Sequence, residues 1–320
     1  MWKTILRRVI LMLPQILILS VLVFIVARFM PGDPFTGLIT PEMDPSTIEA
    51  LRERAGLNDP IIVQYFNWLK NALQGDFGMS YTYKVPVATL IGDRAINTVF
   101  LSLLSLIFTY IIALPLGILA GRYANSAFDK GVVLYNFISY AIPTFVLALL
   151  MVWFFGYELQ WFPTNGSVST GVTEGTLSYY WNRIYHMILP AITYALLGTT
   201  GIIQYLRSEV IDAKQQDYVK TARSKGVPEN MVYNRHIFRN SILPVASTFG
   251  YEITGLIGGS VFIEQIFAYP GMGQLFIQSI YSRDYSVITA LVLLFGITTI
   301  VGTLLSDIIM TIVDPRIRIQ

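Results

Sequence analysis

Apolar residues gather in long runs along this chain, separated by shorter polar segments. A helix needs about 20 consecutive apolar residues to cross the hydrocarbon core of a bilayer. Six segments are close to that length or exceed it, and they lie at 9–27, 98–120, 131–155, 187–206, 242–263 and 286–309. The pattern therefore predicts an all-α polytopic membrane protein with six transmembrane helices.

The composition supports this class and excludes others. Hydrophobic residues make up 54% of the 320 positions and charged residues 13%, with a mean hydropathy of +0.56. A soluble domain carries about 25% charged residues. With no cysteine and only two histidines, the chain offers no disulfide framework and makes a thiolate or histidine metal site unexpected. It also lacks the G-x-x-x-x-G-K-[ST] phosphate loop, and no Ser/His/Asp set or HExxH helix stands out, so we expect no enzyme active site.

The distribution of Lys and Arg predicts the orientation of the helices. If both termini lie inside, fourteen basic residues fall on inner segments, while the two short outer loops hold only Arg183 and Arg283. The long segment at 28–96 holds six more, but long segments cross a membrane largely regardless of charge. The first apolar run exceeds the roughly 7–15 residues of a signal-peptide core, and no small-residue cleavage site follows it. We therefore expect an N-in, C-in protein whose first helix is retained as an anchor.

The region at 29–93, which the orientation places outside, carries its own helix signals. Ser46 and Glu49 form a capping box at the start of a first helix. An Asp-Pro pair at 59–60 offers a second start, and apolar residues at helical spacing follow it up to Gly75. Two short helices are therefore predicted, the second amphipathic. They form either a structural lid on the outer face or a docking surface for an external partner.

Three acidic residues fall within or beside predicted spans, where charge is costly and often functional. Glu264 and Asp307 lie near span ends, so structural pairing is expected for both. Glu252 lies near the middle of the fifth span and is the one candidate for a proton-coupled carboxylate. Prolines also interrupt the spans and predict packing kinks or hinges, at Pro115, Pro143 and Pro190.

The inner segment 207–240, called the cassette below, holds seven of the 22 Lys and Arg residues. Asp217 is placed to cap a short helix at its N-terminus, where a negative charge is favourable. Arg223 and Lys225 lie at the other end of that helix, where positive charge is favourable. Gly226 then permits a left-handed stop.

A second helix is predicted to begin at Pro228 and to run to about Arg239. On the first helix, Tyr218, Ala222 and Lys225 recur at i, i+4 and i+7 and form one narrow face. A plain basic loop would explain the charge of the cassette but not this layout. The cassette is therefore predicted to seat in the groove of a cytoplasmic partner.

The run from Thr221 to Gly226, followed by His236, Arg239-Asn240 and Leu243-Pro244, resembles the cytoplasmic loop of ABC importer permeases. The likeness is greatest to the peptide/nickel branch of that family, and within it to the B-type subunits of oligopeptide permeases. It covers almost the whole chain through short motifs, which include Pro31-Gly32-Asp33-Pro34, Gly75-Asp76-Phe77-Gly78, Leu189-Pro190-Ala191, Glu264 with Phe267, Tyr269-Pro270-Gly271-Met272-Gly273 and Asp314-Pro315-Arg316.

Two features depart from the general importer pattern. Lys220 stands where that pattern has an acidic residue, which puts an acidic contact to the ATPase in doubt. The run from Gly226 to Leu243-Pro244 is also longer than the general version, as it is in the peptide branch. The helix–glycine–helix layout is unaffected.

The resemblance implies a type I ABC importer transmembrane domain in the inner membrane of a bacterial cell. This chain would be one of two homologous permease subunits, and two cytoplasmic ATPase subunits would bind ATP and Mg²⁺. An extracytoplasmic binding protein would deliver an oligopeptide or dipeptide. The chain itself would hold no cofactor, metal or catalytic residue and bind no nucleic acid. The residues that would couple it to the ATPases are Asp217, Tyr218, Thr221, Ala222, Arg223, Lys225 and Gly226.

The resemblance also divides the chain into an anchor helix at 1–28, an extracytoplasmic helical region at 29–93, a permease core at 94–313 and a cytoplasmic tail at 314–320. It places the substrate path between the two permeases, lined in part by the fifth span at Thr254, Gly258 and Ser260.

Two alternatives stay open. A nickel or glutathione permease of the same family differs only in substrate, which the binding protein largely determines. A proton-coupled secondary carrier that uses Glu252 is the alternative from another class. Such carriers are built from internal repeats with paired broken helices, and no convincing repeat relates the two halves of this sequence.

Overall fold

The computed structural model describes residues 2–29, 58–242 and 258–313, together with nine positions between these ranges: Ser46, Glu49, Ala50, Glu53, Val245, Phe249, Glu252, Gly255 and Leu256. Most of the predicted fifth span, the first predicted outer helix, and the motifs that begin at Pro31 and Asp314 therefore lie outside the described residues.

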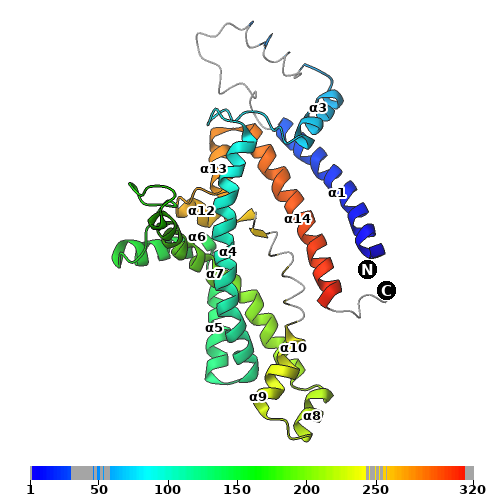
Figure 1. Cartoon of the computed structure of the whole chain (residues 1–320), viewed down its shortest axis with the longest axis vertical. Helices are drawn as coiled ribbons and strands as arrows, with labels where there is room; N and C mark the ends of the chain where they lie inside the picture. Colours follow the sequence, from blue (N-terminus) through cyan, green and yellow to red (C-terminus); the bar gives the residue numbers. More distant parts are fainter. Residues whose placement is uncertain are drawn as a thin grey trace.

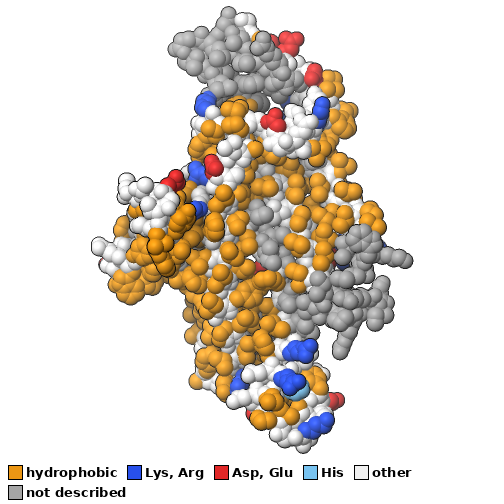
Figure 2. Space-filling model, in the orientation of Figure 1, with side chains coloured by type: hydrophobic (Ala, Val, Ile, Leu, Met, Phe, Trp, Pro, Cys, Tyr) orange, Lys and Arg blue, Asp and Glu red, His pale blue; other side chains and the backbone are white. Residues whose placement is uncertain are grey.

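The described ranges are built from helices, with one isolated strand-like bridge between Met79 and Pro86. Four helices in them are long and apolar enough to cross a membrane, namely α1 (Trp2–Phe29), α4 (Val87–Arg122), α7 (Leu177–Ala213) and α14 (Tyr285–Val313). Figure 1 shows α4 near the centre of the molecule and α1 beside α14, and Figure 2 shows apolar side chains covering the middle of the molecule. Four of the six predicted spans therefore coincide with continuous helices.

The third predicted span is a bent pair of helical segments. α5 (Ala127–Ala141) ends before Pro143, and α6 (Thr144–Met151) with the π-helix η1 (Val152–Glu158) continues at 104° to it. Ile142 is extended because a following proline disfavours the helical conformation of the residue before it. The segment predicted as the third span, 131–155, is therefore interrupted at Pro143, one of the predicted proline kinks, whereas α4 and α7 continue through Pro115 and Pro190.

α4 and α7 pack closely because small residues line their contact. A Cβ atom added at Gly117 would lie 2.8 Å from Cβ of Leu206, and one at Gly121 would lie 2.6 Å from Cβ of Val210. Such distances mean overlap, so glycine lets the two backbones approach. The close approach fixes the C-terminal end of α7 against the C-terminal end of α4, and the cassette follows directly from α7.

α12 (Val261–Ile266) and α13 (Met272–Ser282) pack on each other and lie away from the cassette (Figure 1). Glu264 is fully buried there and accepts hydrogen bonds from the backbone N–H groups of Gly273 (2.6 Å) and Gln274 (3.1 Å). The Thr98 hydroxyl donates to the same carboxylate (2.7 Å) and accepts the N–H of Met272 (2.8 Å). Together the two side chains satisfy the free amides of the first turn of α13. The structural pairing expected for Glu264 is confirmed.

The pairing expected for Asp307 is also confirmed. α1 packs along α14, and Arg8 on α1 forms an ion pair with Asp307 on α14 at 2.9 Å. A Cβ atom added at Gly296 of α14 would lie 2.5 Å from Cδ2 of Leu19, so these two helices also meet closely.

The second predicted outer helix is present as α3 (Ile61–Leu73). It packs on α1, where the Tyr65 and Ser20 hydroxyls lie 2.8 Å apart and the Tyr65 ring meets the Phe24 ring edge-on. Its remaining apolar face, with Ile62 and Phe66, is exposed.

Candidate functional site: the inner cassette

The cassette forms a helical unit at the C-terminal end of α7 (Figure 1). α8 (Asp217–Ser224) follows α7 after a short turn. Gly226 then has φ +73°, which confirms the predicted left-handed stop. Pro228 precedes α9 (Glu229–Met231), the π-helix η2 (Val232–Ile237) and α10 (Phe238–Ser241), which run on without a break. The predicted helix–glycine–helix layout is confirmed, with a π-helical turn in its second half.

A small apolar core holds α8 against α7 and η2. Val219 of α8 is fully buried and Ala222 is 6% exposed. The buried residues that they meet share one cluster, which contains Val210, Ala213, Val232, Tyr233 and Ile237. Burying a valine side chain stabilises a fold by about 1.5–3 kcal/mol, so this core fixes where α8 lies.

The outward face of α8 differs from the predicted one. Tyr218 is 40% exposed, and Lys225 is exposed as well. Ala222 points inward, so the prediction that it shares a face with Tyr218 is wrong. The reason is that Val219 and Ala222, at i and i+3, form the buried stripe of this short helix. Thr221 is exposed, and its hydroxyl donates to the carbonyl of Asp217 at 2.8 Å.

Two exposed ion pairs brace the cassette. Asp217 lies in the first turn of α8 and accepts from Lys220 at 2.9 Å, while Gln216 takes the N-cap position predicted for Asp217. Arg223 donates to Glu229 through Nε (3.1 Å) and Nη2 (2.6 Å) and so spans the Gly226 turn. Arg223 lowers the pKa of Glu229, and Lys220 lowers that of Asp217.

The cassette is also tied to the end of α4. The Lys214 ammonium donates to the carbonyls of Gly121 (3.2 Å) and Arg122 (2.9 Å), which are free at a helix C-terminus. Arg122 donates to the side chain of Asn230 at 2.8 Å and lies over the Tyr233 ring at 4.5 Å from its centroid. These contacts join α4 directly to the segment before α8 and to α9 and η2 after it.

A buried ion pair joins the start of α5 to α7. Asp129 is 2% exposed, and Arg207 donates to it through Nε (2.5 Å) and Nη2 (2.8 Å). The N–H of Asn125 also donates to this carboxylate (2.7 Å), and Ser126 caps α5. Sequence reasoning missed this pair, although the Ser-x-x-Asp spacing at 126–129 is a helix-start signal that could have pointed to it.

The residues predicted for the substrate path are described only in part. Thr254 lies outside the described residues. Ser260 caps α12, with its hydroxyl accepting from the N–H of Ile263 at 3.4 Å, and a Cβ atom at Gly258 would meet no atom within 4 Å. On the same predicted span, Glu252 accepts a hydrogen bond from the Tyr110 hydroxyl of α4 at 2.5 Å.

The geometry of the cassette suits transmission of movement. α8 presents an aromatic and basic surface outward, while its inner face, the Arg223–Glu229 pair and the Lys214 and Arg122 contacts connect it to α4 and α7. Figure 2 shows Lys and Arg side chains gathered over this end of the molecule. A force that a partner protein applies to α8 is therefore transmitted to α4 and α7 through these hydrogen bonds and packing contacts.

Comparison with known proteins shows similarity over almost the full chain. Residues 113–319 match the family described as binding-protein-dependent transport system inner membrane component, and residues 1–102 match its N-terminal region. The chain is 42% identical over 315 residues to the oligopeptide transport system permease protein AppB of Bacillus subtilis, covering 98% of each protein. It is 38% identical over 318 residues to a putative peptide transport system permease protein of Brucella abortus, BAB2_1050, covering 99% of each. It is 34% identical over 318 residues to the glutathione transport system permease protein GsiC of Escherichia coli, again covering 99% of each.

Proposed function

The chain belongs to the binding-protein-dependent transport system inner membrane component family, and from this premise we propose that its cassette couples it to ATPase subunits. It is a permease subunit of a bacterial ABC importer and resides in the inner membrane. The resemblance seen in the sequence is thereby confirmed. The permease forms half of a translocation pathway, and separate subunits hydrolyse ATP.

The observation that carries the proposal is the construction of α8. Its Val219–Ala222 stripe is buried against α7 and η2, while Tyr218 and Lys225 face outward. An exposed aromatic residue on a short helix with a rigid backing is suited to a partner's groove. Closure of the ATPase pair on ATP would press on α8 and shift the spans between two states. ATP can shift that equilibrium only because it binds one of the two states of the complex more tightly than the other.

The proposed topology has six spans with both termini inside. The ion pair between Arg8 and Asp307 supports it, because it places the start of α1 and the end of α14 at the same level. In this topology the bent α5–α6 pair is the third span, and the segment 242–263 is assigned from its sequence as the fifth. The second permease and the binding protein complete the proposed assembly.

The proposed substrate is an oligopeptide or dipeptide. Two of the relatives named above carry peptide transport in their names, and one of these is the 42% identical AppB. Glutathione is the alternative, because GsiC is also similar over its full length, and glutathione is itself a small peptide. We propose that Thr254, Gly258 and Ser260 contribute to the path. The open space at the Gly258 Cβ position supports this placement.

Cysteine cross-linking tests the coupling role, since the chain has no native cysteine. Tyr218→Cys should form cross-links to a co-purified ATPase subunit, and their yield should change when ATP is bound. Ala222→Cys, one turn away and buried, is the matched control and should react poorly. Cross-linking from Ala222→Cys but not from Tyr218→Cys would reverse the proposed seating of α8.

A further inference from the structure

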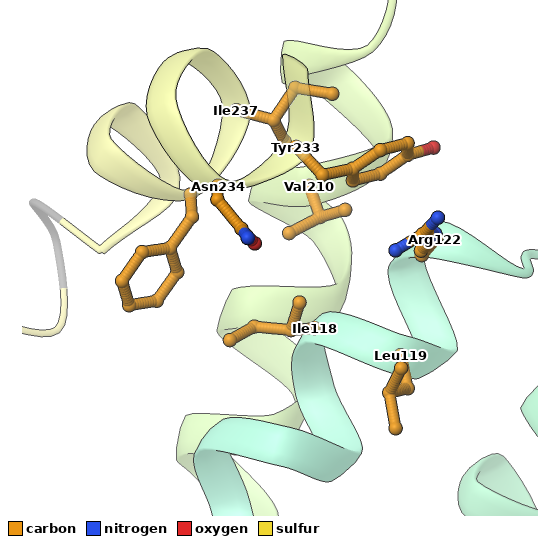
Figure 3. A pocket seen from close by; sticks show the side chains of 8 residues that line it. Ile118, Leu119, Arg122, Val210, Tyr233, Asn234 and Ile237 are labelled. Carbon is orange, nitrogen blue, oxygen red and sulfur yellow. The ribbon is translucent and has the colours of Figure 1, made fainter. Parts of the chain in front are cut away.

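A pocket opens where η2 and α10 lie over the inner end of α4 (Figure 3). Its cavity measures about 240 Å³. Its lining combines apolar side chains with three polar ones, and the residues are Ile118, Leu119, Arg122, Val210, Tyr233, Asn234, Ile237 and Phe238. Figure 3 shows Ile118 of α4 and Asn234 of η2 pointing toward each other across it.

The pocket lies where α4 passes from apolar to polar sequence. The apolar run of α4 ends at Ala120, and Arg122 follows in the last turn. Ile118 and Leu119 therefore belong to the membrane side of the pocket, and Arg122 belongs to the aqueous side. Basic pockets between transmembrane helices at the cytoplasmic side are typical sites for anionic lipid headgroups.

The charge of Arg122 is open to such a ligand. Its guanidinium bonds the neutral side chain of Asn230 and lies over the rings of Tyr123 and Tyr233. Among the described residues it forms no ion pair with a carboxylate. Glu229 is the acidic residue whose charge interacts with Arg122, and Glu229 is already held by Arg223.

The size of the pocket suits part of an amphiphile. Pockets that enclose a whole small molecule measure about 300–1,000 Å³, and this one is smaller. Leu119, which lines the pocket, is 38% exposed, so an apolar part of the lining is accessible from the surroundings of the protein. A ligand can therefore place its polar end at Arg122 while most of its length stays in the bilayer.

We propose that this pocket binds an anionic glycerophospholipid of the inner leaflet. The phosphate lies at Arg122, and the first part of an acyl chain lies against Ile118, Leu119 and Phe238. The proposal goes beyond the transport function and does not depend on which substrate is carried.

A lipid at this position touches the core of the cassette. Tyr233 and Ile237 line the pocket and also belong to the cluster that buries Val219 and Ala222 of α8. Occupancy therefore supports η2 against α4 from the membrane side. The ATPase activity of the complex should be higher in membranes that supply the lipid.

The test uses the purified protein, with the subunits that co-purify, in nanodiscs of phosphatidylcholine with or without phosphatidylglycerol. Native mass spectrometry counts the retained phosphatidylglycerol, and a photo-crosslinking residue at Asn234 identifies what occupies the pocket. Arg122→Gln removes the charge and Ile118→Trp fills the apolar end. Lys130→Gln is the matched control, because it removes an exposed basic charge at the start of α5 without lining the pocket.

Wild type and Lys130→Gln should retain phosphatidylglycerol and cross-link to it from Asn234. Arg122→Gln should weaken retention about fivefold, the usual contribution of one basic side chain near an anionic surface. Ile118→Trp should abolish the cross-link even with Arg122 present. Equal retention in all four proteins, or a cross-link from Asn234 to an ATPase subunit in place of lipid, would overturn the proposal.

Discussion

Replacing Gly226 by valine should uncouple transport from ATP hydrolysis without removing the protein from the membrane. Gly226 has φ +73°, a conformation that β-branched residues adopt only under strain. A Cβ atom at this position meets no atom within 4 Å, so the substitution introduces no collision. Its cost is confined to the backbone of the turn that joins α8 to α9.

The size of the effect depends on the backbone strain at position 226 and on the contacts that hold the turn in place. A left-handed conformation costs an L-residue about 1–2 kcal/mol. The Arg223–Glu229 pair across the turn is exposed, and pairs of this kind contribute about 0–1 kcal/mol, so it cannot hold the turn alone. Val219 and Ala222 keep α8 on its core, and the strain is relieved by a changed angle between α8 and η2. A penalty of 1–2 kcal/mol corresponds to a factor of about 5–30 in the equilibrium between the native and the altered arrangement.

The assay compares substrate uptake with ATP hydrolysis in proteoliposomes that contain the complete complex. Gly226→Val should lower the substrate taken up per ATP by about 5–30-fold, in line with that equilibrium. Gly226→Asn is the matched control, because asparagine tolerates the left-handed region, and it should transport nearly as well as wild type. Normal uptake by Gly226→Val, or equal losses in the two variants, would show that the left-handed turn at Gly226 does not control coupling.

Two further predictions concern the spans. Gly121→Ala places a Cβ atom 2.6 Å from Cβ of Val210 and should destabilise the purified protein by about 1–3 kcal/mol, seen as a lower Tm, whereas Gly131→Ala meets no atom within 4 Å and should not. Equal Tm values for both would contradict the close α4–α7 contact. Glu252→Gln should leave ATP-driven uptake largely intact, because an amide oxygen still accepts the hydrogen bond from Tyr110. Loss of uptake with assembly and ATPase activity preserved would revive the proton-coupled carrier.

The features predicted most successfully from the sequence are those with a local physical cause. Apolar length alone located α1, α4, α7 and α14. The left-handed Gly226 and the start of a helix after Pro228 followed from the conformational preferences of single residues. The same holds for the start of α3 after Pro60.

The features that the sequence did not predict depend on contacts between distant segments. Pro143 looks like Pro115 and Pro190 in the sequence, yet it alone separates two helical segments by 104°. The inward direction of Ala222 is set by the surfaces of α7 and η2, which are not visible in an eight-residue helix. Asp129 and Arg207 are 78 positions apart, so only the packing of α5 on α7 brings them together.

The central claim is that the cassette seats this permease on ATPase subunits. The most direct measurement is identification of every protein that co-purifies with the tagged chain after gentle detergent extraction, for wild type and Gly226→Val. Wild type should bring down two ATPase chains and a second permease. A chain that purifies without an ATPase and still transports in liposomes under a proton gradient would contradict the central claim.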